Sequence, residues 1–223
     1  ITLNTLLNPI DIYGKSKYEA DLLAQKANME GLNVACIRPR TVLGNERLGI
    51  FGILFDWIKD SSNIYIIGSG NVLFQFLHVE DLSDFSIEVC IQKKPGIYNV
   101  GTDNFSTLKE DLQYLIDYAN SSSKIKSLPV NLTINILKIL DKLHLSPLAP
   151  YHYYAYGKSI YFDIEHAKKA INWKPKYSNK QLLSNTYDNF IKNFQLIKNN
   201  KNNNSIHKKL VKQGILKILK YFS

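Results

Sequence analysis

Segments with the hydrophobic spacing of helices alternate along the chain with short apolar runs typical of strands, and together they predict an α/β protein. Helical spacing runs through residues 13–30, with Leu22, Leu23 and Ala27 as the apolar positions. The apolar run at 33–39 ends in proline and predicts a buried strand. Further helices are predicted at 48–59, 81–91, 108–118, 132–143, 163–171 and 179–193, and further strands at 64–67, 74–78 and 96–101. Strands that alternate with helices are typical of a mostly parallel sheet covered by helices.

Positive charge is concentrated near the end of the chain. The formal net charge is +9, and residues 191–223 contain eight lysines and no acidic residue, so residues 1–190 are close to neutral. Nucleic-acid-binding domains usually carry a basic face on the folded part, so nucleic acid is not predicted as a partner. No apolar stretch reaches about 18 residues, so the sequence predicts no membrane-spanning helix.

Residues 199–205 form a polar linker before a basic segment with helical spacing. Its apolar stripe consists of Val211, Ile215, Ile218, Leu219 and Phe222. Three interpretations stay open for 206–223: a solvated tail, peripheral contact with an anionic membrane surface, or docking on a partner. The two cysteines, Cys36 and Cys90, lie among apolar neighbours, which predicts buried, reduced thiols in a cytoplasmic protein.

Tyr13 and Lys17 are the candidate catalytic pair. Residues at i and i+4 share one helix face, and an ammonium beside a phenol favours the phenolate. Such a phenol exchanges a proton with a substrate hydroxyl more readily near neutral pH. The spacing alone is weakly specific, because chance predicts roughly one or two such pairs here, and Tyr154 and Lys158 form a second. The surrounding sequence favours the first pair.

Five segments around this pair occur in an order that points to a known family. They lie at 8–19 (Tyr-x-x-x-Lys), 38–44, 68–81 (Gly-Ser-Gly to His-Val-Glu-Asp), 98–101 and 162–175. Together they resemble the extended short-chain dehydrogenase/reductase family, in particular its NAD-dependent epimerase/dehydratase group, over residues 9–191. The resemblance implies a partial Rossmann-like parallel sheet within 1–198. It also implies a small mixed α/β substrate-binding subdomain from 44–95 and 102–190, followed by the basic tail at 199–223.

The resemblance also implies roles in catalysis and in binding NAD or NADP. Tyr13 would be the general acid and base. Lys17 would lower the pKa of Tyr13 and bind the nicotinamide ribose. Pro39, Thr41 and Val42 would line the nicotinamide pocket. No metal is implied.

The substrate-binding residues implied by the resemblance lie in loops. Asn45, Glu46 and Arg47 would face the substrate cleft. Phe74 stands where nucleotide-sugar enzymes often carry an arginine that pairs with the diphosphate, and a phenyl ring cannot form such charge-assisted hydrogen bonds. Lys158 or Arg47 would then replace that arginine, and a less charged alcohol or ketone stays open as the substrate.

Three polar residues in the matching segments have simpler structural interpretations. We expect Asp81 to cap a helix. His78 is expected to be a packed or hydrogen-bonded strand residue, and Asn99 is expected to bond to backbone.

The glycine-rich dinucleotide fingerprint is absent at the required spacing. The family carries it near its N-terminus, so the sequence predicts that it lies upstream of Ile1 and that this chain alone has no measurable affinity for NAD. The predicted whole enzyme is an NAD(P)-dependent epimerase or dehydratase of a nucleotide sugar. The alternatives are an NAD(P)-dependent reductase of another hydroxyl or keto compound, and a non-catalytic fragment. The resemblance further implies a homodimer through the Tyr13 helix.

Overall fold

Parallel strand pairs form the framework of the computed structural model, which describes residues 1–45, 47–143, 145, 157–199, 213–214 and 216–221. The three ladders are β1 (Ala35–Pro39) with β5 (Gly96–Val100), β2 (Thr41–Leu43) with β4 (Phe76–His78), and β3 (Ile64–Ile67) with β6 (Ile125–Leu128). All three are parallel, so the α/β class with a parallel sheet is confirmed.

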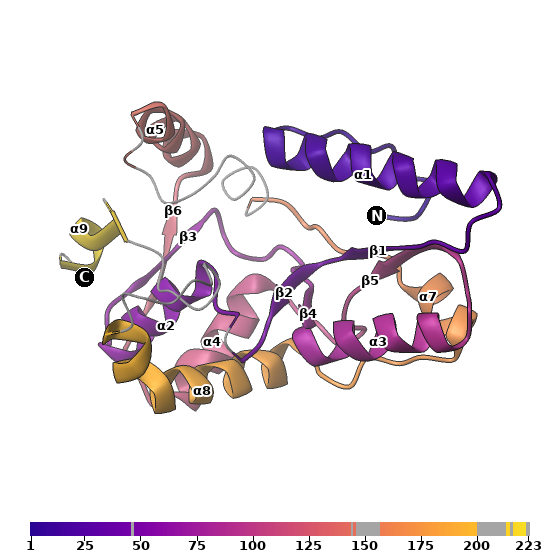
Figure 1. The fold of residues 1–223 in the computed structure, drawn as a ribbon. Coiled ribbons are helices and arrows are strands. Elements are labelled where there is room, and N and C mark those ends of the chain that lie inside the picture. Colours follow the sequence, from indigo (N-terminus) through magenta and orange to yellow (C-terminus); the bar gives the residue numbers. More distant parts are fainter. Residues whose placement is uncertain (46, 144, 146–156, 200–212, 215, 222–223) are drawn as a thin grey trace.

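Helices cover both faces of the β1–β5 ladder. The helices of the described residues are α1 (Ile12–Met29), α2 (Phe51–Lys59), α3 (Val79–Ile91), α4 (Leu108–Tyr118), α5 (Val130–Lys142), α7 (Glu165–Ile171), α8 (Asn179–Asn199) and α9 (Leu216–Tyr221). Helix α1 lies on one side of the ladder and α3 on the other, whereas α2, α4 and α8 gather around the remaining strands (Figure 1). The predicted helices are confirmed, with ends shifted by a few residues.

Two apolar clusters hold these elements together. One surrounds the β1–β5 ladder, where the Phe85 ring makes edge contacts with Tyr98 and Trp173 at centroid distances of 5.5 and 5.0 Å. The other joins α2 to α8, with Phe55 between Tyr187 and Phe190 at 5.7 Å from each ring. Helices α3 and α7 pack with the first cluster. The proposed boundaries of a substrate subdomain stay a prediction.

The face of α1 that packs on the rest of the chain is not the apolar face that the sequence predicts. Leu22 and Leu23 are exposed, and the buried residue of this helix is Asp21. The expectation for the cysteines is also wrong for Cys90, which is exposed because it lies near the outer end of α3, while Cys36 is half-buried.

The described part of the tail packs on α2 of its own chain. The Lys220 ammonium donates to Asp56 and Asp60 at 2.6 Å each. Gln213 donates to Asp56 at 2.9 Å and accepts a hydrogen bond from the Trp57 indole at 3.2 Å. Residues 213–214 and 216–221 thus contact their own chain, and docking of the tail on a partner stays a prediction. Residues 200–212, 215, 222 and 223, which include the start of the predicted stripe, lie outside the described residues.

Membrane contact by this tail stays a prediction. In the part of the chain that the structure describes, no helix has both the length and the apolar character needed to cross a bilayer.

Candidate active site

The first turns of α1 present the Tyr13–Lys17 pair. The Asp11 carboxylate caps the helix by accepting a hydrogen bond from the Gly14 amide at 2.6 Å, which fixes where the helix begins. Tyr13 therefore lies in the first turn and Lys17 one turn later. The Lys17 ammonium is 5.5 Å from the centroid of the Tyr13 ring, and 71% of Tyr13 is exposed. The two side chains thus share a helix face, as the spacing predicts, and are open to a ligand.

A buried carboxylate attaches α1 to β1. Asp21 accepts two hydrogen bonds from the Arg38 guanidinium, at 3.1 and 2.6 Å, and one from the Cys36 thiol at 2.8 Å. Burial alone would raise the pKa of Asp21, but these hydrogen bonds and the Arg38 charge hold it below its usual value. Burial and the adjacent carboxylate raise the pKa of Cys36 to about 11. The contact fixes the rotation of α1 on the sheet.

The same contacts set the direction of α1. The Asn28 amide bonds to the backbone of Val34 at the start of the ladder, and Asp21 bonds to Arg38 near its end. Earlier helix residues therefore lie beside later strand residues, and the start of α1 extends past the carboxyl end of β1. Ligands of open parallel α/β sheets bind outside the carboxyl ends of the strands. The Tyr13–Lys17 pair lies at that edge.

The residues predicted to line the nicotinamide pocket follow directly at this edge. Pro39 is exposed and ends β1, and Thr41 and Val42 are half-buried in β2. Between them Arg40 donates its backbone N–H to Val100 at 2.9 Å, which carries the pairing one residue past β1. Their role in binding the cofactor stays a prediction.

Arg40 is a charged residue of this region that the sequence analysis does not single out. It is buried, and its guanidinium carbon lies 5.5 Å from the Phe74 ring centroid and 5.3 Å from that of Phe162. Its position in the sequence could have identified it, because Arg40 directly follows Pro39, the proline that ends the predicted strand.

The loop predicted to face the substrate begins at the end of β2. The Arg47 amide donates to the Gly44 carbonyl at 3.0 Å and closes a tight turn, on which Asn45 is exposed and Arg47 half-buried. Gly44 has a φ of +153°, and a Cβ there would lie 2.5 Å from a Val79 methyl carbon, so no other residue fits. Glu46 lies outside the described residues.

Phe74 does not lie in an open cleft. Only 2% of it is exposed, and its ring packs on Phe76 at 5.0 Å, so its predicted contact with substrate is replaced by a core position. Lys158 is exposed, and its segment lies beside Phe74 because Ile160 bridges to Phe74 and the Ser159 hydroxyl accepts from Leu73 at 3.0 Å. Tyr154, which forms the second Tyr-x-x-x-Lys pair with Lys158, lies outside the described residues.

The N-terminus of α3 is capped by His78 and not by Asp81. The cap is His78, whose Nδ1 accepts from the Glu80 amide at 3.2 Å. Burial lowers the pKa of His78 despite nearby carboxylates. Asp81 is fully buried in the first turn of α3 and accepts from the amides of Lys176 and Tyr177 at 2.9 and 3.2 Å. Burial raises the pKa of Asp81 although these amides oppose the change. The expected cap at Asp81 is therefore wrong, and the packed role of His78 is confirmed.

Asn99 has an unsatisfied side chain. It is 2% exposed, and neither its amide nitrogen nor its amide oxygen has a hydrogen-bond partner among the described residues, so the expected backbone bond is not seen there. It pairs in register with Arg38, and registered residues of neighbouring strands point to the same face. The amide therefore lies on the α1 side of the ladder. A buried polar group without a partner costs free energy and is often explained by a missing ligand or neighbour.

Asn179 organises the strand next to the site, and the sequence analysis does not identify it. Its amide oxygen accepts from the Phe76 backbone at 3.0 Å, and its amide nitrogen donates to the Phe74 carbonyl and to Asp111 at 2.6 Å each. It therefore ties α8 to β4 and α4. Because an asparagine at a helix start is typical of a cap, the sequence gives no indication that Asn179 contacts β4 and α4.

The parallel ladders flanked by helices define a Rossmann-like α/β fold. Residues 1–101 match the model described as the NAD dependent epimerase/dehydratase family.

Curated relatives and solved structures are also similar to the chain. The chain is 39% identical over 222 residues to the uncharacterized protein y4nG of Sinorhizobium fredii, covering 99% of this chain and 56% of the relative. It is 26% identical over 199 residues to a UDP-glucuronate 4-epimerase of Thermodesulfobacterium geofontis, covering 85% and 53%. A UDP-glucuronic acid 4-epimerase from Bacillus cereus, solved with NAD, superposes with a TM-score of 0.66 at 17% identity, covering 86% of this chain and 56% of that one. The chain spans about half the length of the curated relatives it matches.

Proposed function

We propose that this chain supplies the proton-transfer and substrate-facing part of an NAD(P)-dependent epimerase or dehydratase that acts on a nucleotide sugar. The observation that carries the proposal is the exposed Tyr13–Lys17 pair at the carboxyl edge of the β1–β5 ladder. Tyr13 takes the proton of a substrate hydroxyl and returns it, and Lys17 lies one helical turn away with its ammonium 5.5 Å from the Tyr13 ring centroid.

The donor set at this edge fits the nicotinamide end of NAD or NADP. Lys17 forms no ion pair with a described residue, so its ammonium is available to the hydroxyls of a ribose. Pro39, Thr41 and Val42 would form the wall beside it. The bound cofactor supplies hydride transfer, and the chain contributes orientation and proton exchange.

Pyrophosphate binding requires a further part of the protein. No glycine-rich fingerprint with the required spacing occurs in the 223 residues. Two observations support a neighbouring segment on the α1 side of the ladder: the unsatisfied amide of Asn99, and the exposed Leu22 and Leu23 on α1. We propose that the glycine-rich half covers this side. Its absence explains why we expect no measurable binding of NAD by the 223-residue chain in calorimetry.

The test of the catalytic role uses the protein together with its upstream sequence. Tyr13→Phe should lower turnover by about 100-fold to 10,000-fold while NAD affinity stays within a few-fold. Tyr18→Phe is the matched control, because it removes a hydroxyl from the same helix without touching the pair, and it should leave turnover unchanged. Unchanged turnover in Tyr13→Phe would remove Tyr13 from the mechanism.

The substrate class is tested separately by thermal shift. A nucleotide-sugar enzyme should be stabilised by UDP-, GDP- or dTDP-sugars in the presence of NAD, because a ligand that binds only the native state raises its stability. Phe74 stands where nucleotide-sugar enzymes often carry an arginine that pairs with the diphosphate, which supports the alternative of a less charged substrate. Stabilisation by non-nucleotide ketones or alcohols alone would support that alternative and exclude the nucleotide sugar.

A further inference from the structure

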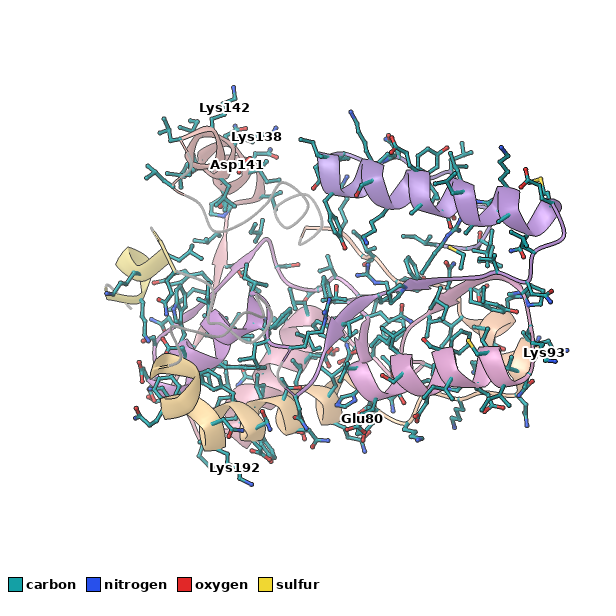
Figure 2. The ribbon with its side chains drawn as sticks, viewed as in Figure 1. Glu80, Lys93, Lys138, Asp141, Lys142 and Lys192 are labelled. Carbon is teal, nitrogen blue, oxygen red and sulfur yellow. The ribbon has the colours of Figure 1, made fainter. Side chains whose placement is uncertain are left out.

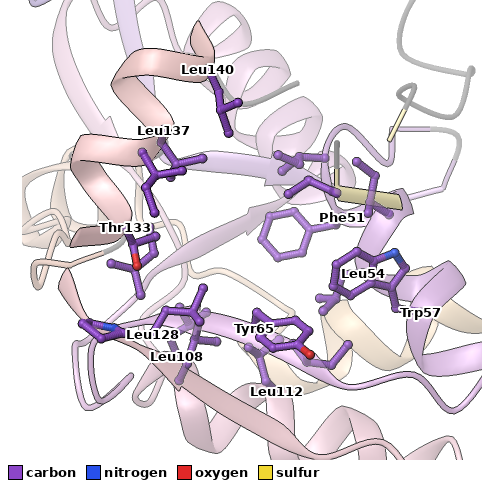
Figure 3. A pocket seen from close by; sticks show the side chains of 18 of the residues that line it. Phe51, Leu54, Trp57, Tyr65, Leu108, Leu112, Leu128, Thr133, Leu137 and Leu140 are labelled. Atoms are coloured by element: carbon purple, nitrogen blue, oxygen red, sulfur yellow. The ribbon is translucent and has the colours of Figure 1, made fainter. Parts of the chain in front are cut away.

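The C-terminal helix α9 lies against an apolar pocket. This pocket has a volume of about 520 Å³ and lies between α2, α4, α5 and the β3–β6 ladder. Phe51 and Trp57 of α2 face Leu137 and Leu140 of α5 across it (Figure 3). Leu216, the first residue of α9, is also part of the wall. A ligand group that enters from this side therefore has to move α9.

Polar contacts with α2 hold α9 beside the pocket. The Lys220 ammonium donates to the Asp56 and Asp60 carboxylates at 2.6 Å each. The Gln213 side chain donates to Asp56 at 2.9 Å and accepts from the Trp57 indole at 3.2 Å. The Lys220 and Asp56 side chains are 18% and 14% exposed, so salt screens this ion pair less than a pair on the surface. The residue before α9 and a residue near its end are thus both bound to one helix.

Charge complementarity explains why the tail binds at this place. Residues 191–223 contain eight lysines and no acidic residue, whereas Asp56 and Asp60 lie one turn apart at the end of α2. Two carboxylates at this spacing repel each other, and Lys220 offsets the repulsion by pairing with both. The carboxylate of α5 near this end of the molecule, Asp141, lies at the outer edge and does not line the pocket (Figure 2). The negative charge that binds α9 is therefore on α2.

The helix is too short to persist without these contacts. It has six residues, and isolated helices shorter than about 12 residues are marginal in water. Among the described residues, no other helix or strand packs broadly against it, and Leu216 is its apolar contact with the core cluster around α2 and α8. Loss of the Lys220 contacts should therefore release α9 as a unit, while the apolar clusters keep the rest of the fold intact.

We propose that α9 is a releasable cover over one side of the apolar pocket, held closed by Lys220 and Gln213 on α2. With the cover closed, Leu216 occupies part of the wall. With the cover released, the apolar residues of α2 behind it are open to a ligand. The proposal rests on the contacts of α9 and does not depend on the proposed function.

The test compares two charge reversals in the full 223-residue chain. Lys220→Glu places a third carboxylate beside Asp56 and Asp60. Lys217→Glu is the matched control, because it makes the same change of charge at an exposed position of the same helix. The readout is the affinity for Nile red, a neutral apolar dye, in a fluorescence titration. Lys220→Glu should bind the dye at least about tenfold more tightly than the wild type, because more of the protein is open. Lys217→Glu should stay within about twofold.

Hydrogen exchange separates release of the helix from opening of the pocket. The amides of 216–221 should exchange at least about tenfold faster in Lys220→Glu, while those of β1 and β5 keep their wild-type rates. Thermal melting checks that each variant folds. Gln213→Ala removes the second contact without a change of charge, and it should shift both readouts in the same direction if Lys220→Glu does not fold.

Three results would overturn the proposal. Faster exchange of α9 in Lys220→Glu with unchanged dye affinity would show that the helix does not cover the pocket. Unchanged exchange in this variant would show that the Lys220 contacts do not hold the helix. An equal gain of dye affinity in Lys217→Glu would assign the effect to net charge.

Discussion

Replacing Asp21 by asparagine tests whether one buried carboxylate holds the Tyr13 helix on the sheet. The exposed fractions of the Asp21 and Arg38 side chains are 7% and 17%. Asp21→Asn keeps the size of the side chain but leaves the guanidinium of Arg38 without its counter-charge. Removing one partner of a buried pair costs 3–5 kcal/mol, and the partial exposure of Arg38 favours the low end, about 3 kcal/mol. For a protein of this size the melting temperature should fall by roughly 6–12 °C.

The assay is urea denaturation of the wild type, Asp21→Asn, Arg38→Gln and the double variant. The coupling energy from this cycle should be about 2 kcal/mol, because the two side chains are in direct contact. Glu30→Gln is the control on the same helix: Glu30 pairs with Lys26 at 3.7 Å, and the two side chains are 60% and 72% exposed. Its removal should change stability by less than about 0.5 kcal/mol.

The pH dependence gives an independent check. The folded-state pKa of Asp21 is lowered, so its contribution is complete above the unfolded value of about 3.9 and is lost as the pH falls through the folded pKa. The difference between wild type and Asp21→Asn should therefore shrink below about pH 4. An Asp21→Asn variant as stable at pH 7 as Glu30→Gln, or a coupling energy near zero, would refute the reasoning.

Three further outcomes follow from buried contacts. Asn179→Ala leaves the Phe76 N–H without an acceptor and should cost about 3 kcal/mol in urea denaturation; a loss under about 1 kcal/mol would contradict this. At pH 8 iodoacetamide should modify exposed Cys90 roughly tenfold faster than Cys36, whose pKa is about 11, as read by mass spectrometry. Equal modification rates for the two cysteines would contradict the exposure of Cys90 and the raised pKa of Cys36. Lys220→Gln should speed hydrogen exchange in residues 216–221, and unchanged protection would mean that apolar contacts alone hold α9.

Local signals in the sequence locate several elements closely. The helix predicted at 108–118 has the same ends in the structure, where Thr107 and Glu110 form a capping box in which each side chain accepts from the backbone of the other residue. The shared face of Tyr13 and Lys17 follows from helix periodicity alone. The sequence misses the strand at 125–128, because its two central residues are polar and its partner strand is distant in the chain.

Features that depend on tertiary partners are not visible in the pattern. Periodicity favours Leu22 and Leu23 as the buried face of α1, but the helix turns Asp21 inward, since Arg38 and Cys36 supply its hydrogen bonds. The buried position of Phe74 has the same kind of cause, because a ring fits a core as well as a cleft. A single sequence does not show which segment will pack on it.

The strand pairing has a consequence for how the chain folds. Ala35 pairs with Gly96 and Ile64 with Ile125, so each ladder closes only after a long intervening segment has come together. Such non-local pairing is slow, since the entropy of loop closure is lost before any sheet contact forms. During this interval the unpaired strands are exposed, and the chain is then most open to proteases and to self-association.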